Sequence, residues 1–176
     1  ILVASGFEDS QVIKTAQMLR GKGINVRTVA VNGLESVNGL RGSSIEPDAS
    51  LSGVKINELD AVIIPGGNST AIFKVFDNVL TLLMEMHSAG KPIGAIGNGT
   101  AVLAAAGLTK NMRVTGDEAL RNDLEESGAN FLDQGLVVDH NLVTAQSNEN
   151  LIHLVDSINF LLEPSSHMVD EAPTKA

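Results

Sequence analysis

The sequence contains no cysteine, no tryptophan and no tyrosine, and its only aromatic residues are five phenylalanines. The absence of cysteine excludes disulfides, zinc–thiolate sites, iron–sulfur clusters and any mechanism that uses a thiol nucleophile. The shortage of aromatic side chains excludes a single-stranded nucleic-acid binder that stacks bases on aromatic platforms.

Basic residues are also few. Lys and Arg number 12 against 21 Asp and Glu, which gives a formal net charge of −9. Because phosphate binding needs clustered basic side chains, we expect no nucleic-acid partner. Every apolar run is far shorter than a membrane span, so we expect no membrane partner and a cytoplasmic location. A leader peptide ahead of Ile1 would lie outside this sequence.

Aliphatic residues, in contrast, are plentiful. Hydrophobic residues make up 43% of the 176 residues, which is enough for the core of one compact domain. We predict a single domain over residues 1–163. Residues 164–176 are polar, hold two prolines and show no period, so we predict a loose C-terminal tail there.

Short apolar strands alternate with helical patterns along the chain. The predicted strands cover residues 1–4, 24–31, 60–64, 92–96, 136–140 and 141–145. The predicted helices cover residues 9–20, 69–87, 100–106 and 150–162. This alternation favours a three-layer α/β fold with a mostly parallel sheet.

Three predicted strands end in glycine-rich segments, Ser5-Gly6, Pro65-Gly66-Gly67 and Gly97-Asn98-Gly99. Open parallel sheets bind ligands at the carboxyl ends of their strands. Glycines there can turn backbone N–H groups toward an oxygen, so a small anionic or carbonyl ligand would fit. Alternatively, these glycines only form tight turns. The dinucleotide and phosphate-loop fingerprints are absent, and we predict no cofactor.

Charged side chains give weaker indications. His87, His140, His153 and His167 show no metal-ligand spacing, so we predict no metal site and structural or solvated roles. Glu8 and Asp9 either form a carboxylate pair or favour the dipole of the first helix. The acidic stretch over residues 117–126 reads as a solvated face, with a partner surface as the alternative.

Several segments of the sequence, taken together, resemble the DJ-1/ThiJ/PfpI family from Ile1 to about Leu162. The segments that carry the resemblance are residues 3–9 (VASGFED), 19–24 (LRGKGI), 41–42 (RG), 47–48 (PD), 60–67 (DAVIIPGG), 87–92 (HSAGKP), 93–96 (IGAI), 137–139 (VVD) and 142–144 (LVT). The resemblance implies a doubly wound, flavodoxin-like fold and a homodimer.

The resemblance also implies a reactive cysteine at the turn after the strand that ends at Ile96. A glutamate from the first helix normally hydrogen-bonds that thiol, and many members add a histidine. With these groups the family performs glyoxalase, deglycase, hydrolase or oxidative-sensing chemistry.

This sequence departs from the family at those positions. Gly97 occupies the cysteine position and Gln11 the glutamate position, and the stretch 128–130 supplies no histidine. The family's Gly-Pro-Gly-Thr loop reads Ser-Asn-Glu-Asn over residues 147–150. Gly97 offers no nucleophile, and Gln11 cannot act as a base near neutral pH. The residue at this turn normally holds a strained backbone angle, and glycine adopts such angles without steric cost, so we expect the turn to keep its geometry without strain.

We therefore predict no catalytic residues and a ligand pocket beside the degenerate positions. Its predicted members are Gly6, Gln11, Gly66, Gly67, Gly97, Asn98, Thr100 and Ser147. Asn98 either contacts a ligand or caps the helix from Thr100, and we favour the cap.

Three functions stay open at this point. The first is a non-catalytic, stress-related family member that binds a small ligand or a protein. The second is a glyoxalase, deglycase or hydrolase that uses Asn98, Thr100, Ser147 and Glu149. The third is a structural partner of an active paralogue.

Overall fold

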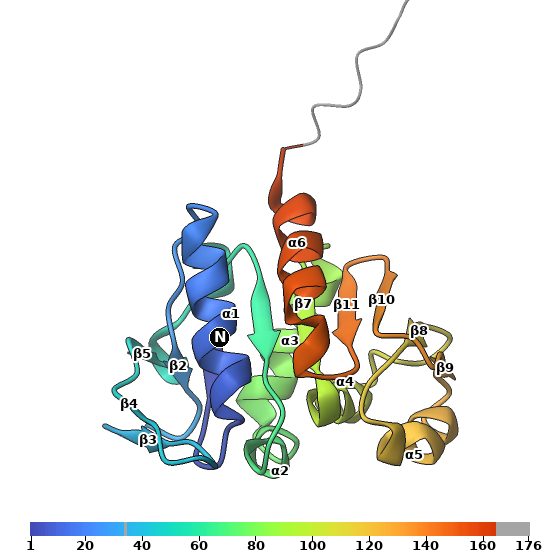
Figure 1. The fold of residues 1–176 in the computed structure, drawn as a ribbon, viewed down its shortest axis with the longest axis horizontal. Helices are drawn as coiled ribbons and strands as arrows, with labels where there is room; N and C mark the ends of the chain where they lie inside the picture. Colours follow the sequence, from blue (N-terminus) through green and yellow to red (C-terminus); the bar gives the residue numbers. More distant parts are fainter. Residues whose placement is uncertain (34, 165–176) are drawn as a thin grey trace, which may run out of the picture.

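The computed structural model describes residues 1–33 and 35–164 (Figure 1). The strands are β1 (Leu2–Val3), β2 (Val29–Ala30), β3 (Val37–Asn38), β4 (Ser44–Ile45), β5 (Ala49–Ser50), β6 (Val62–Ile64), β7 (Ile93–Ile96), β8 (Arg113–Val114), β9 (Asn130–Phe131), β10 (Leu136–Asp139) and β11 (Leu142–Ala145). The helices are α1 (Asp9–Gly21), α2 (Ser69–Phe73), α3 (Asp77–Ser88), α4 (Thr100–Ala105), α5 (Arg121–Glu126) and α6 (Leu151–Leu162). The predicted tail beyond Pro164, with His167, lies outside the described residues.

Parallel strands form the centre of the molecule. One sheet has the order β1-β2-β5 and another the order β10-β11-β7-β6, and β1 lies against β6. Ile93 of β7 pairs with Val62 of β6 on one side and with Leu142 of β11 on the other, and both pairings are parallel. Only the edge strand β10 runs antiparallel to its neighbour in these two sheets. The predicted mostly parallel sheet is confirmed, and its carboxyl ends lie together.

Helices cover both faces of this sheet, as Figure 1 shows. On one face α6 packs against β7 and β11 and also against α1, burying Ile63, Leu154 and Ile158. On the other face α3 and α4 pack against β7, burying Ile64 and Leu83 among others. Because neighbouring strand residues point to opposite faces, Ile63 and Ile64 serve different cores. The three-layer prediction is thereby confirmed.

Two predicted elements are shorter than expected. The helix predicted over 69–87 is interrupted after α2, where Phe76 adopts an extended conformation before α3 begins. Val75, which the predicted stripe would bury, is exposed. The strand predicted over 24–31 forms ladder pairs only at Val29 and Ala30. Just before this ladder, the N–H and hydroxyl groups of Thr28 donate to the carboxylate of Asp48 instead of to a strand backbone. Apolar periodicity alone detects neither interruption.

The short hairpin of β3 and β4 is attached to α1 by the carboxylate of Asp9. Asp9 accepts hydrogen bonds from the N–H groups of Arg41 and Ser43 and from the Ser43 hydroxyl. Burial alone would raise the pKa of Asp9, but these hydrogen bonds outweigh it and lower the pKa. Asp9 is only 7% exposed, so the interaction is shielded from solvent.

The free energy of unfolding should therefore depend on the ionisation of Asp9. A lowered native pKa means that this stabilisation is complete above the usual aspartate pKa of about 3.9 and is lost as the pH falls through the native value. We expect Asp9→Asn to lower the free energy of unfolding by about 1–3 kcal/mol at neutral pH and to make its decrease at acid pH less steep. Urea unfolding at several pH values measures both. Asp123→Asn, on the exposed side of α5, is the control and should change neither.

Candidate functional site

Three glycine-rich turns meet at the carboxyl ends of β1, β6 and β7. A Cβ on Gly67, whose φ is +97°, would lie 2.7 Å from the backbone nitrogen of Glu8 and even closer to the carbonyl oxygen of Gly6. A Cβ on Gly6, with φ +82°, would lie 2.8 Å from the Cβ of Asn68. Only glycine permits both the left-handed backbone and this close approach. These glycines therefore bring the turns into direct contact.

Gly97 follows β7 directly and has a φ of +57°. Gly97 therefore adopts neither an ordinary helical nor a strand conformation, in agreement with the unusual backbone angle expected at the family's cysteine position. A Cβ built on Gly97 would have only two neighbours within 4 Å, the Nε2 atom of Gln11 at 3.6 Å and the carbonyl oxygen of Gln146 at 3.8 Å. These are ordinary van der Waals distances. The chain therefore keeps room for a side chain at this turn but places none there.

Gln11 extends from α1 into this junction and is only 6% exposed. Its Oε1 accepts a hydrogen bond from the N–H of Gly66 at 2.6 Å, and its Nε2 donates to the Oδ1 of Asn148 at 2.8 Å. The Gly66 donor requires an oxygen, so the amide orientation is determined and the nitrogen faces Gly97. A carboxyl group in the family is here replaced by a fixed hydrogen-bond donor.

Asn98 contacts the second glycine of the Pro-Gly-Gly turn. Its Oδ1 accepts from the N–H of Gly67 at 2.8 Å, and its Nδ2 donates to the carbonyl oxygen of Gly67 at 3.1 Å. The predicted helix cap is therefore wrong, and the structure shows no side-chain cap on α4. A 3-10 turn over Gly97–Gly99 leads directly into α4, and Gly99 is already helical. Asn98 is left to bridge two turns.

Thr100 and Ser147 are held in structural hydrogen bonds. Thr100 is fully buried and donates to the carbonyl oxygen of Thr115 at 2.9 Å. Ser147 accepts from the N–H of Glu149 and bonds the side chain of Asn150. Neither contact activates a hydroxyl. Ser147 is the pocket residue predicted from the segment after β11, but it is the neighbouring Asn148 that reaches Gln11.

Gly116 and Gln146 also reach this site, and neither is among the pocket residues predicted from the sequence. A Cβ on Gly116 would lie 2.9 Å from the carbonyl oxygen of Gly97, so the backbone there covers the turn. Gln146 follows β11, the parallel neighbour of β7. The rule that strand carboxyl ends gather at one edge could have located Gln146, whereas no sequence signal marked Gly116.

Charged groups are directed away from Gly97. Asp9 binds the hairpin, and Glu8 accepts from the Nε of Arg41 at 3.2 Å, so the two carboxylates do not form a catalytic pair. His140 lies in the turn between β10 and β11 beside Asp139, and His153 lies on α6. Within residues 1–33 and 35–164, no three histidine or acidic side chains are placed to share a metal ion. The side chains identified beside Gly97 are neutral amides.

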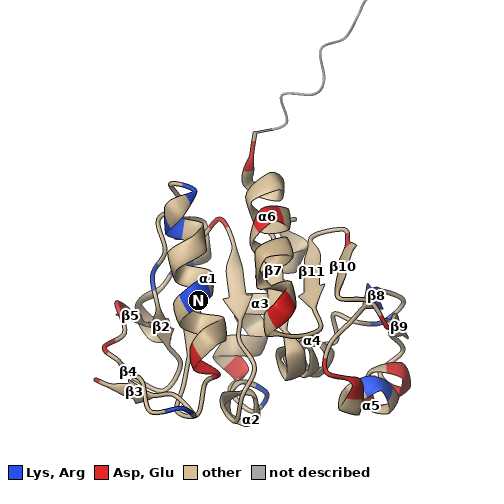
Figure 2. Cartoon of the chain, in the orientation of Figure 1, with Lys and Arg blue, Asp and Glu red and all other residues tan. Residues whose placement is uncertain are grey.

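Acidic side chains are concentrated instead around α5 (Figure 2). The residues involved are exposed, as expected of a solvated face: Asp117, Glu118, Asp123, Glu125 and Glu126. Arg121 pairs with Glu118 at 2.6 Å and Glu125 at 3.8 Å.

No helix among the described residues is long and apolar enough to cross a bilayer.

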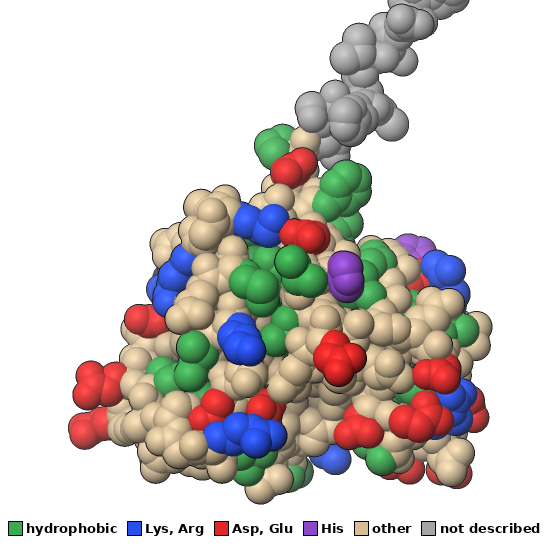
Figure 3. Space-filling model, viewed as in Figure 1, with side chains coloured by type: hydrophobic (Ala, Val, Ile, Leu, Met, Phe, Trp, Pro, Cys, Tyr) green, Lys and Arg blue, Asp and Glu red, His purple; other side chains and the backbone are tan. Residues whose placement is uncertain are grey.

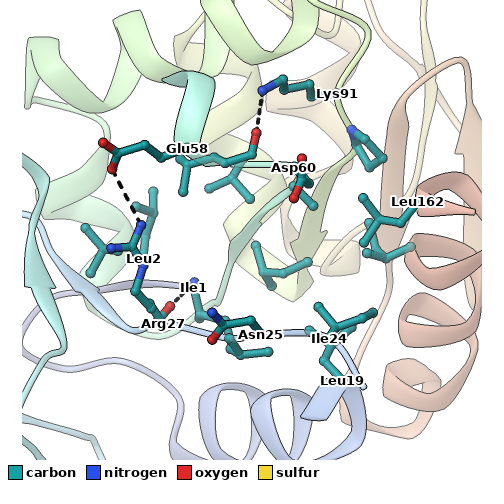
Figure 4. Close-up of a pocket in the computed structure, with 18 of the residues that line it drawn as sticks. Ile1, Leu2, Leu19, Ile24, Asn25, Arg27, Glu58, Asp60, Lys91 and Leu162 are labelled. Carbon is teal, nitrogen blue, oxygen red and sulfur yellow. Dashed lines mark hydrogen bonds and ion pairs between the residues drawn. The ribbon is translucent and has the colours of Figure 1, made fainter. Parts of the chain in front are cut away.

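A cavity of about 650 Å³ lies at the opposite, amino end of the sheet (Figure 4). Ile1, Leu19, Ile24 and Leu162 contribute apolar walls. Among its charged side chains, Lys91 donates to the carbonyl oxygens of Ile56 and Leu59, Arg27 lies 3.9 Å from Glu58, and Asp60 also lines the wall. The lining contains no histidine, serine or threonine among the described residues, so the turn at Gly97 remains the candidate site.

Comparisons with known proteins agree with this geometry. Residues 1–159 match the model of the DJ-1/PfpI family. Protein/nucleic acid deglycase 2 of Escherichia coli is 31% identical, with 86% of this chain and 89% of that protein covered. Deglycase PfpI of Pyrococcus furiosus is 28% identical, with 82% and 87% covered.

A solved structure from Anabaena variabilis extends the comparison to the fold. That protein contains a DJ-1/ThiJ/PfpI-like and a ferritin-like domain, and it superposes with a TM-score of 0.88 at 29% identity. The superposition covers 99% of this chain but 50% of that protein, so the match corresponds to about half its length. With the family model matched over residues 1–159, the chain belongs to the DJ-1/PfpI family.

Proposed function

We propose that this chain is a DJ-1/PfpI family protein that works without the family's cysteine chemistry and binds a small molecule beside Gly97. The observation that carries the proposal is the set of side chains at this turn and the hydrogen bonds that hold them. Gly97 supplies no nucleophile, while Gln11 and Asn98 are hydrogen-bonded to the two glycines of the neighbouring turn. Nucleophilic catalysis needs an attacking group with an adjacent base, and neither is provided by these residues.

Nearby hydroxyl groups do not replace the thiol. Thr100 is buried and donates its proton to a backbone carbonyl, so its oxygen has no base to activate it. No described histidine contacts Thr100 or Ser147 through a side-chain hydrogen bond. A serine or threonine mechanism would need such a contact to draw off the proton.

The names of the relatives favour a second candidate, a deglycase or hydrolase that acts on small substrates. This activity would have to come from Asn98, Thr100, Ser147 or Glu149. Glu149 is the one carboxylate among these four residues, and it is exposed in the segment after β11. In this second candidate Glu149 would be the base.

A substrate panel separates the two candidates. We expect purified protein to show no turnover of methylglyoxal, glycated amines, esters or amides above a protein-free blank. Turnover that Thr100→Ala or Glu149→Ala abolishes would establish the second candidate instead. Lys14→Ala, on the exposed side of α1, controls for the handling of variant protein.

We also propose a homodimer, as the family resemblance implies. Apolar side chains exposed on helices support a protein partner: Ile152 is 55% exposed and Phe160 67% exposed on α6. Figure 3 shows hydrophobic side chains among charged ones on the face where α1 and α6 lie. Association with an active paralogue would use the same kind of surface.

A further inference from the structure

A second cavity, of about 500 Å³, lies at the amino ends of β7 and β11. It is lined by the end of α3, the loop before β7, the turn between β10 and β11 and the last turn of α6. Figure 1 shows the β10–β11 turn at the same end of the sheet as the end of α6. The buried side chain of Asn141 in this turn donates to the carbonyl oxygen of Lys91 at 2.7 Å, which holds the turn against the loop. The cavity is therefore preformed, and its volume is typical of small-molecule sites.

His140, which lines this cavity, occupies a position that favours glycine. Asp139 of β10 pairs with Leu142 of β11, so His140 and Asn141 form a two-residue hairpin turn. His140 has a φ of +53°, whereas Asn141 does not have a positive φ. A positive φ at the first central residue alone is the type II′ pattern, in which glycine is preferred because it lacks a Cβ. An imidazole held against this preference indicates a role for the side chain.

The imidazole ring of His140 is oriented by a carboxylate. Its Nδ1 lies 3.0 Å from the Oδ1 of Asp139, whose Oδ2 accepts from the backbone N–H of Arg113 at 2.8 Å. That backbone hydrogen bond lowers the pKa of Asp139, so the carboxylate is ionised at neutral pH. In the neutral ring the Nδ1 proton is donated to Asp139, and Nε2 is left as an acceptor. Because the side chain of His140 is 77% exposed, a ligand in the cavity can reach Nε2.

Apolar surface makes up much of the remaining wall. Pro92, Met112 and Leu161 supply it. The thioether of Met112 favours contact with an aromatic ring. His87 adds a second imidazole, whose Nδ1 is buried without a hydrogen-bond partner among the described residues. These walls therefore suit a flat aromatic ring.

Charged ligands gain little in this cavity. Within the part of the chain that the structure describes, no Lys, Arg, Asp or Glu lines it. The ammonium group of the adjacent Lys91 donates to the carbonyl oxygens of Ile56 and Leu59, and Arg113 is paired with Asp139 at 3.5 Å. A carboxylate or an ammonium group would therefore lose hydration without gaining an opposite charge of its own.

We infer that this cavity binds a small uncharged phenol. The phenol hydroxyl donates to Nε2 of His140, and the ring packs against Met112, Pro92 and Leu161. His140 is then the specificity-determining residue, and Asp139 is a positioning residue that keeps Nε2 as an acceptor. Gly97 lies at the opposite, carboxyl end of β7. The inference thus goes beyond the proposed function and does not depend on it.

p-Cresol and 4-methylanisole form a matched pair of probes, because the second differs only in a methyl group that replaces the hydroxyl hydrogen. We expect titration of isotope-labelled protein with p-cresol at pH 8 to shift the Met112 methyl resonance and the His140 amide resonance. 4-Methylanisole should bind about tenfold more weakly, since it has no donor for His140. Benzoate, which is charged, should bind at least as weakly as 4-methylanisole. These titrations use the unmodified protein.

His140→Gly tests the specificity role directly. Glycine suits the left-handed position, so the free energy of unfolding should not fall, whereas the affinity for p-cresol should fall about tenfold, to that for 4-methylanisole. Asn111→Gly is the matched control. Asn111 also has a positive φ, +62°, and is exposed, but it does not line the cavity. This control should keep the tenfold preference for p-cresol.

Several results would overturn the inference. Equal binding of p-cresol and 4-methylanisole, tighter binding of benzoate, no binding of p-cresol, or shifts confined to residues away from the cavity would each contradict it. A preference that survives His140→Gly, or one that is lost in Asn111→Gly, would also do so. If His140→Gly did not fold, the probe comparison on the unmodified protein would still decide the matter. Turnover of methylglyoxal reports on Gly97 alone and leaves this inference unaffected.

Discussion

Gly97→Cys combined with Gln11→Glu should create thiol-dependent turnover of methylglyoxal in a protein that otherwise shows none. The turn leaves room for the new side chain, since a Cβ on Gly97 has its nearest neighbours at 3.6 and 3.8 Å. The nearer neighbour is the end of the Gln11 side chain, so a glutamate there would lie within reach of the new thiol. A positioned acid–base group is worth about 10²-fold or more in rate.

The double variant carries a predictable stability cost. A non-glycine residue at φ +57° pays about 1–2 kcal/mol for the left-handed backbone. Glutamate at position 11 keeps an acceptor for Gly66 but loses the donor to Asn148. Asn148 is exposed and can rotate its amide to donate instead, so we expect the variant to fold.

Gly107→Cys with Gln11→Glu is the matched control. Gly107 also has a positive φ, +73°, and an open environment, but it lies in the turn after α4. Its cysteine should react with thiol reagents without turning over methylglyoxal. If the control matched the Gly97 variant in rate, or if the Gly97 variant folded and stayed inactive, the preserved geometry of the turn would not be a functional one.

Gly67→Ala should be among the most destabilising single substitutions in the chain. Its Cβ would meet the backbone of Gly6, Phe7 and Glu8, which cannot move without displacing β1 from its neighbours. Overpacking against backbone and a left-handed φ together predict a loss of about 3 kcal/mol. The same change would separate the Gly67 N–H from Asn98. Urea unfolding gives the free energy of unfolding.

Gly107→Ala isolates the backbone contribution to that loss. Gly107 has a similar positive φ, but nothing lies within 4 Å of its Cβ position. We expect a cost of about 1 kcal/mol. Equal losses at the two positions would mean that close contact between the turns does not stabilise the site.

Strand–helix alternation was sufficient to predict the layers of this fold. Residues 60–64 and 92–96 are continuous apolar runs, and both lie as parallel strands covered on two faces. The break between α2 and α3 could not be predicted in the same way, because the apolar period continues through Ile72, Val75 and Val79. Tertiary packing, not local pattern, decides which of these side chains is buried.

The position of the candidate site can be predicted from the sequence, but its hydrogen bonds cannot. Glycines at strand ends predict a site at this edge of the sheet, and the family positions point to Gly97 and Gln11. Asn98 was assigned to a cap because asparagine before a helix commonly caps it. Its actual partner, Gly67, is 31 residues away, and only the parallel pairing of β6 and β7 brings the two turns together. Long-range contacts of this kind leave no local pattern.

The initial rate of methylglyoxal loss with the unmodified protein shows whether the family's turn is retained at Gly97 without its cysteine chemistry. We expect a rate equal to that of a protein-free blank at any protein concentration. A rate proportional to protein concentration, reduced by Asn98→Ala or Glu149→Ala but not by Lys14→Ala, would contradict it.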